Sequence, residues 1–366
     1  NASSTNGITT GTANIAIGLG AMAGDGTAVT GSNNIAVGRY AGQKFTSGNS
    51  NVAIGQSSLD ATTTASNNTA IGTNSLTANT TGSNNTALGI QALDGNTTGS
   101  ENVGIGSNAL GSNTTANDNV AIGGGALATN TTGADNVAIG RVALANSTTA
   151  ANNVAIGRNA LLATTTGINN TALGYNAGLS MTSGQQNVFV GAQSGDAITT
   201  GENNTAVGQG ALANDDVGLG SVALGTQAMT NQNIASAGYT LNTAVGFQSL
   251  YYNVTGAGNT ALGYRAAFGS ATGASHSSNT AIGYHALKDI TTGNSNTAVG
   301  AGSLDANTTA SDCTAVGTNA LSTNTVGQSN TAVGTSALQA NLNGTRNTAV
   351  GRTALQSNTS GSDNTS

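Results

Sequence analysis

The sequence predicts an all-β protein, a parallel β-solenoid of about 20 coils. A five-residue phrase, Asn-(Thr/Val/Ile)-Ala-(Ile/Val/Leu)-Gly, returns about twenty times in the 366 residues, and its closing glycines mostly lie 17 residues apart. The composition alone, with 54 Gly, no Pro and 6% charged residues, would suggest disorder. A disordered chain, however, has no reason to keep its apolar residues in register. Each repeat is therefore expected to form one coil that shares a core with its neighbours.

The glycine spacing sets the boundaries of the coils. The 17-residue step runs without a slip from Gly38 to Gly225 and resumes from Gly283 to Gly351. Longer, irregular repeats lie near residues 19–33, 226–241 and 264–278. We expect one continuous solenoid over residues 1–366, forming a segment of a longer fibre.

Each coil, numbered from its Asn as position 1, opens with a short strand. In one coil Asn136 is followed by Val137, Ala138 and Ile139, and Gly140 takes position 5. β-Branched and aliphatic residues favour a strand, whose alternation puts positions 2 and 4 on one side and the Ala on the other. The Gly is expected to end the strand, where the backbone needs a positive φ or a close approach. The Asn column is expected to form an amide ladder between coils.

The second half of each coil is predicted to close the turn. Position 8 is always Ala or Ser and position 9 is usually Leu, as at Leu144, which we interpret as a second short strand with a core residue. A Thr-Thr-Gly or Thr-Thr-Ala segment follows and is typical of a turn. The apolar core per coil is therefore thin.

The Ala column at position 3 leads to a prediction of self-association. With positions 2 and 4 facing the interior, Ala138 and its equivalents would line an outward face that is small and apolar along the fibre. Such a face favours close packing of another chain. We expect a homotrimer with this column at the contact, or a fibre joined end to end.

The repeat also resembles a known group of fibres. Asn-Thr-Ala-Val-Gly-x-x-Ala-Leu with Thr-Thr-Gly-x-Asn-Asn is similar to the head repeats of trimeric autotransporter adhesins. It is closer to the 17-residue variant in bacterial surface fibres and phage tail-fibre proteins. The resemblance runs from Asn14 to Ser366 and implies a left-handed parallel β-roll, three chains around one axis, and a role as shaft or receptor-binding head.

Charge and cysteine content exclude several classes. A net charge of −6 with only eight Lys and Arg argues against nucleic-acid binding, and no apolar run is long enough to cross a membrane. Cys313 stands alone at an Asn position, so neither a disulfide framework nor a cysteine metal site is expected. A small stacked side chain is the favoured interpretation of this cysteine, and a reactive thiol is the alternative. No cofactor is expected.

The candidate recognition site lies where the pattern breaks, between residues 231 and 285. Seven of the eleven aromatic residues lie between Tyr239 and Tyr284. Three aromatic residues take position 6, and a polar residue follows each at position 7: Phe247 and Gln248, Tyr264 and Arg265, Tyr284 and His285. Two interpretations stay open, a stacked ladder that supports the fibre and a patch that contacts a cell-surface glycan or receptor.

Two charged columns are also notable. Glu101, Asp118 and Asp135 take position 17 in consecutive coils, where a Ca²⁺ site or a solvated edge would account for them. Arg141 and Arg158 follow each other at position 6, where solubility is the favoured role.

These features favour a non-enzymatic structural and adhesive fibre located outside the cell, at a cell surface or on a virion. The sequence offers no nucleophile–base pair or differentiated carboxylates for catalysis. The alternative is an ice-binding solenoid, since Thr-rich solenoids can present flat Thr arrays. The expected inward placement of Thr at position 2 argues against that alternative.

Overall fold

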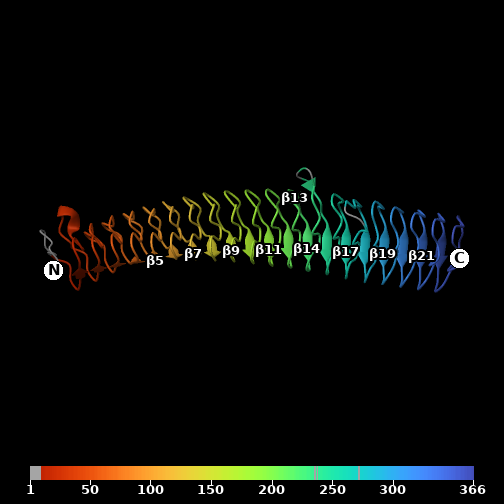
Figure 1. The fold of residues 1–366 in the computed structure, drawn as a ribbon, viewed down its shortest axis with the longest axis horizontal. Coiled ribbons are helices and arrows are strands. Elements are labelled where there is room, and N and C mark those ends of the chain that lie inside the picture. Colours follow the sequence, from red (N-terminus) through yellow and green to blue (C-terminus); the bar gives the residue numbers. More distant parts are fainter. Residues whose placement is uncertain (1–9, 235, 237, 271–272) are drawn as a thin grey trace. The chain divides into compact units, whose positions relative to one another are not determined.

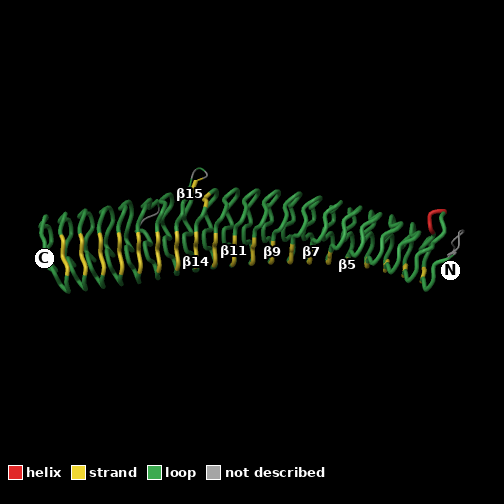
Figure 2. Tube along the Cα trace, turned by 180° about the vertical axis from the view of Figure 1, so that it is seen from behind, coloured by secondary structure: helices red, strands yellow, loops and turns green. Residues whose placement is uncertain are grey.

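The computed structural model describes residues 10–234, 236, 238–270 and 273–366. It is an all-β parallel solenoid of about 19 turns, which confirms the fold class predicted from the sequence. The chain divides into two compact units, Asn1–Gly184 and Gln185–Ser366, which are described separately below. Within each unit every coil contributes one strand to a ladder of parallel strands (Figures 1 and 2).

The first unit contains a short 3-10 helix, η1 (Gly24–Gly26), inside its long first repeat. Its strands are β1 (Ile15–Ile17), β2 (Ile35–Val37), β3 (Val52–Ile54), β4 (Thr69–Ile71), β5 (Thr86–Leu88), β6 (Val103–Ile105), β7 (Val120–Ile122), β8 (Val137–Ile139), β9 (Val154–Ile156) and β10 (Thr171–Leu173). The phase of the repeat sets their register, since Ala121 pairs with Ala138 and Ala138 with Ala155.

The second unit contains a ladder of the same kind and one small additional sheet. The ladder strands are β11 (Val188–Val190), β12 (Thr205–Val207), β14 (Val222–Leu224), β16 (Thr243–Val245), β17 (Thr260–Leu262), β18 (Thr280–Ile282), β19 (Thr297–Val299), β20 (Thr314–Val316), β21 (Thr331–Val333) and β22 (Thr348–Val350). β13 (Gly218–Leu219) pairs with β15 (Gly238–Tyr239), which lies on the loop inserted in the 226–241 repeat (Figure 2). Residues 235, 237, 271 and 272 of the two long repeats lie outside the described part.

The predicted inside and outside of the strands are reversed. Ala121, Ala138, Ala155, Ala298 and Ala332 are all fully buried within a single chain, so the Ala column lines the core. The prediction that this column lies at the chain–chain contact is therefore wrong. Side chains at positions 2 and 4 point away from the core, and several at position 4 are exposed, such as Leu173 at 45%.

The second half of each coil is a series of turns, not a second strand. Ala143 and Leu144 are buried as expected, but both lie in a turn segment, and no described coil has a strand at these positions. Leu144 has a positive φ of 51°. A β-branched or bulky residue seldom adopts that conformation, and here burial of the leucine in the core offsets the strain. Its backbone N–H donates to the carbonyl of Ala160 in the next coil at 2.9 Å.

The amide ladder is confirmed at position 1. The Nδ2 of Asn136 donates to Oδ1 of Asn119 at 3.1 Å and to the carbonyl of Ala150 at 2.9 Å, and Asn136 is fully buried. These bonds satisfy amide groups that would otherwise be costly to bury. A second buried ladder at position 12 was not predicted, and in it Asn113 donates to Asn96 at 2.8 Å.

Candidate functional site

The position-6 aromatics of the irregular region form a stacked ladder on the second unit. The ring centroids of Phe247 and Tyr264 are 5.6 Å apart with an interplanar angle of 10°, and those of Tyr264 and Tyr284 are 5.4 Å apart at 9°. The side chain of Tyr264 is thus stacked on both sides. Its edge, not its faces, is what remains open to a partner.

The position-7 residues line this ladder. Arg265 Nε donates to Oε1 of Gln248 at 2.8 Å, and Nε2 of Gln248 donates to Oε1 of Gln227 at 2.8 Å. The ring of His285 stacks on Tyr284, with centroids 4.0 Å apart. Partial burial is the main reason that the pKa of His285 is lowered, and the positive charges of Lys288 and Arg265 lower it further, whereas Asp305 and Asp289 raise it.

The six predicted site residues are therefore brought together as one surface. The stacking supports the interpretation of these aromatic residues as a ladder, because each ring packs against the next. Contact with a glycan or receptor stays a prediction, and it would have to use ring edges and the polar position-7 groups. Tyr284 is 58% exposed, the most of the three rings, and offers the largest open surface.

Positions 2 and 4 turn outward along each strand, and the residue at position 6, after the glycine, is exposed in most coils; we call these three positions together the strand face. Its large exposed apolar residues include Ile54, Leu88, Ile90, Ile122, Leu173 and Tyr175 in the first unit. In the second unit they include Val188, Phe247, Leu262, Tyr264, Tyr284, Val316, Val333 and Val350. Within its unit the aromatic ladder thus follows, two positions on, the continuous apolar column of position 4.

The acidic column has a backbone explanation. Glu101, Asp118 and Asp135 are exposed and have φ values of 63°, 59° and 59°, in the left-handed region where Asn and Asp are enriched. Elsewhere in the same column Asn152 and Asn169 have φ values of 57° and 59°. Among the described residues no group of three His, Cys, Asp or Glu side chains could hold a metal ion, so the geometry favours the solvated edge.

The arginines at position 6, Arg141 and Arg158, are both exposed on the strand face of the first unit. The described structure gives neither an ion-pair partner. A role in solubility requires that these position-6 side chains stay in solvent, at the rim of any contact made through position 4.

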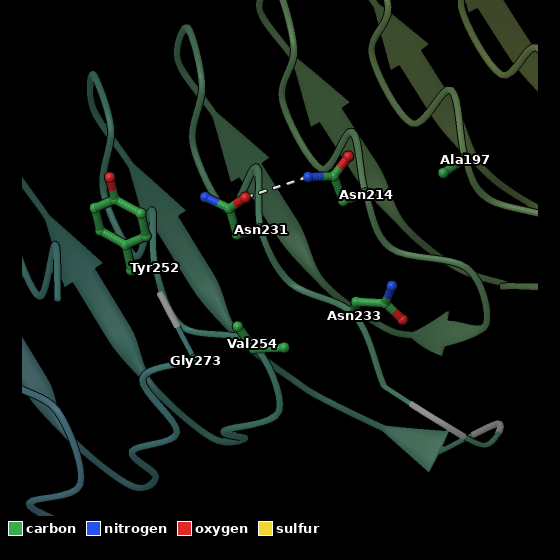
Figure 3. A pocket seen from close by; sticks show the side chains of 7 residues that line it. All are labelled: Ala197, Asn214, Asn231, Asn233, Tyr252, Val254 and Gly273. Carbon is green, nitrogen blue, oxygen red and sulfur yellow. Dashed lines mark hydrogen bonds between the residues drawn. The ribbon is translucent and has the colours of Figure 1, made fainter. Parts of the chain in front are cut away.

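A pocket of about 470 Å³ lies on another side of the second unit (Figure 3). Its lining includes Asn214, Asn231, Asn233, Tyr252, Val254 and Ala197. These residues were not predicted from the sequence, in which the aromatic column at position 6 is the more prominent pattern. The signal was available, since Tyr252 replaces the small or polar residue usual at position 11, beside two long repeats.

Next to this pocket, a buried polar cluster repairs a gap in the amide ladder. Ser221 replaces Asn at position 1, and Nε2 of Gln232 donates to Oγ of Ser221 at 3.1 Å and to Oδ2 of Asp215 at 2.9 Å. Burial raises the pKa of Asp215, and the hydrogen bond from Gln232 offsets part of that rise. The polar groups of the cluster hydrogen-bond to one another, so we interpret its role as structural.

His276 takes the place of the Gly or Ala of a Thr-Thr-Gly segment and is fully buried. Its Nδ1 lies 3.4 Å from Oδ1 of Asn259, and its Nε2 has no hydrogen-bond partner among the described residues. Burial lowers the pKa of His276 to about 4. This histidine is therefore neutral in the fold at neutral pH.

Cys313 fills an Asn site in the ladder as the sequence predicted. It is 1% exposed, its Sγ lies 3.3 Å from the carbonyl of Gly327, and burial raises the pKa of the thiol. A raised pKa disfavours the reactive thiolate, which supports the structural interpretation.

Within the described residues the chain forms no helix with the length and apolar character needed to cross a bilayer. Neither a family model nor a curated protein matches this sequence.

Proposed function

We propose that this chain is a non-enzymatic structural segment of an extracellular fibre, a shaft or head at a cell surface or on a virion, in which three copies associate through the strand face. The observation that carries the proposal is the repeated outward display of aliphatic side chains at position 4. In the first unit Leu88 and Leu173 are 44% and 45% exposed, and in the second Leu262 is 47% exposed.

Physical chemistry favours covering this face. Soluble monomers rarely expose contiguous apolar patches larger than a few hundred Å². The strand face repeats one coil after another at the inter-strand distance, roughly 4.8 Å, so its apolar column is contiguous within each unit. Three such strips packed around one axis would shield both edges of every strip. The number three and the left-handed sense of the roll come from the resemblance of the repeat to trimeric fibres.

The proposal is tested by charging the strand face. Ile122, Ile139 and Ile156 take position 4 in consecutive coils, and their joint replacement by Asp should yield monomers in sedimentation velocity, with the circular dichroism unchanged. The matched control replaces Thr132, Thr149 and Thr166 by Asp. These exposed residues take position 14 of the same coils, and the control should keep the assembly. Assembly that survives the Ile changes would refute the strand-face interface.

A second candidate, ice binding, is favoured by one specific observation. Positions 2 of seven consecutive coils in the second unit are Thr, and these strands turn their position-2 side chains outward: Thr243, Thr260, Thr280, Thr297, Thr314, Thr331 and Thr348. The expectation that these Thr would lie with the core is wrong. Thermal hysteresis in a solution of monomers would favour this function over the fibre.

The adhesive part of the proposal concerns the irregular region 231–285. Regular coils repeat the same polar surface and specify no partner, whereas insertions in solenoids collect on loops that often bind. A receptor or glycan contact at this region would make the segment a head and not only a shaft.

A further inference from the structure

We propose that the pocket beside the two long repeats of the second unit binds a neutral saccharide. The inference deepens the adhesive role, because it names a site and a ligand class for the irregular region. It does not rest on trimer formation, since the residues that define the pocket come from one chain and none belongs to the strand face.

Successive coils build the pocket from equivalent positions. Ala197, Asn214, Asn231 and Tyr252 take position 11 of four consecutive coils, and Asn233 and Val254 take position 13 of the last two. Its volume of about 470 Å³ falls within the range of roughly 300–1,000 Å³ that is typical of small-ligand sites. A regular shaft has no need for such a hollow, and it occurs where both neighbouring repeats are lengthened.

The amides of the pocket are held in a directed chain. Nδ2 of Asn214 donates to Oδ1 of Asn231 at 3.2 Å, and Nδ2 of Asn231 donates to the carbonyl of Tyr251 at 3.0 Å (Figure 3). The Oδ1 of Asn214 is left as an acceptor. The backbone N–H of Asn233 donates to the carbonyl of Val254 at 2.8 Å, and no described residue hydrogen-bonds the side-chain amide of Asn233. Together they offer donors and acceptors close to one another, as vicinal hydroxyl groups require.

The ring of Tyr252 supplies the apolar side. It meets Tyr251 edge to face, with centroids 4.7 Å apart at 89°, and Phe268 with centroids 5.1 Å apart at 79°. This packing fixes the ring before a ligand arrives, which reduces the entropic cost of binding. Tyr252 and Val254, which both line the pocket, supply apolar surface that matches the C–H face of a sugar, while the amides match its hydroxyls.

The charge of the pocket narrows the ligand class further. None of the six residues named above is charged, so a phosphate, sulfate or carboxylate would find no cation there. A neutral ligand rich in hydroxyl groups needs no cation in the pocket. The chemistry therefore selects neutral sugars over nucleotides and acidic sugars.

The test is saturation-transfer-difference NMR with galactose, glucose, mannose, N-acetylglucosamine, lactose and sialyllactose, each at millimolar concentration. We expect at least one neutral sugar to bind, and to bind about tenfold more weakly to Asn233→Ala and to Tyr252→Leu. The matched control is Asn146→Ala, an exposed position-11 Asn in a regular coil of the first unit, and it should bind as the unmodified chain does.

Three outcomes would overturn the proposal. The first is that no neutral sugar of the panel binds, and the second is that binding persists in both pocket variants. The third is that sialyllactose binds more tightly than lactose, which would contradict the neutral class. Circular dichroism and sedimentation of each variant separate loss of the site from loss of fold or assembly, so the fibre proposal stands or falls independently.

Discussion

A Cβ atom placed on Gly140 would lie 2.6 Å from the carbonyl oxygen of Gly157, the equivalent glycine of the next coil. Gly140 also has a φ of 134°, a conformation that side-chain-bearing residues rarely adopt. Two independent constraints therefore require glycine at position 5, and they explain why the phrase keeps its closing residue in every coil.

Gly140→Ala is the first prediction. It should lower the free energy of unfolding by about 2 to 4 kcal/mol, because strain and a backbone clash add. The control is Gly124→Ala in the same unit, where an added Cβ meets nothing within 4 Å and φ is not positive. Urea unfolding should place the control within about 0.5 kcal/mol of the unmodified chain. Equal losses in the two variants would contradict this explanation.

The second prediction concerns the inward side of the strands. Phe189 takes position 3, where Ala is usual, and Gly195 takes position 9, where Leu is usual. A Cβ on Gly195 would lie 2.5 Å from Cε1 of Phe189, so the two residues compensate each other in size. Phe189→Ala should cost about 3 to 5 kcal/mol through a cavity, and Gly195→Leu should be destabilised by overpacking.

The double variant restores the usual pair and should recover most of the lost stability. Thermal unfolding of the four proteins forms a double-mutant cycle that isolates the coupling. Strictly additive losses would show that the side chains do not meet in the core.

Cys313→Asn is the third prediction. A regular coil has an amide oxygen at this position: Oδ1 of Asn136 accepts hydrogen bonds from the N–H and Nδ2 of Asn153 in the next coil, at 3.1 and 3.2 Å. Cys313 has no such oxygen. Restoring the amide should raise the free energy of unfolding by about 1 kcal/mol. The mirror change, Asn136→Cys, should lower it by a similar or larger amount. A stabilising Asn136→Cys would show that the ladder contributes nothing.

His276 provides the fourth prediction, a pH dependence. Its pKa is about 4 in the fold, against 6.5 for the exposed group. The unfolded chain therefore binds a proton that the folded chain does not, and stability falls as the pH drops from 6.5 towards 4. The loss from this group is about 3 kcal/mol over that window.

Urea unfolding at several pH values should show this slope in the unmodified chain. In His276→Ala, which carries a residue that several other coils have at this position, the slope should be smaller by that contribution. Identical slopes in the two proteins would mean that the histidine is already protonated or exposed in the fold.

The sequence was sufficient for the period, the strand at positions 2 to 4 and its register, because a phase kept over many coils admits few folds. It also predicted a second strand at positions 8 and 9, where the structure has turns. It did not say which side of the strand faces inward. Alternation places Ala138 on one side of the strand and Val137 and Ile139 on the other, but it does not say which side faces the core. The larger aliphatic residues usually lie in the core. Here the coil is narrow: a Cβ on Gly104, at position 3, would lie 3.2 Å from Cγ of Leu93. Only a small residue fits opposite that Leu.

The pocket could not have been predicted from spacing alone. Asn214, Asn231 and Tyr252 share a column, but the hollow depends on how two insertions leave the coil, and inserted loops have no repeat to fix them. The aromatic ladder, by contrast, follows directly from position 6, and its residues were placed correctly together.

The central claim is that the strand face is covered by other copies of this chain, and light scattering of the unmodified protein, coupled to size exclusion, tests it most directly. The account predicts a mass of about three times that of one chain, unchanged over a wide range of concentrations. A stable monomer with an open strand face would contradict it, and a mass that grows without limit with concentration would replace the trimer by end-to-end joining.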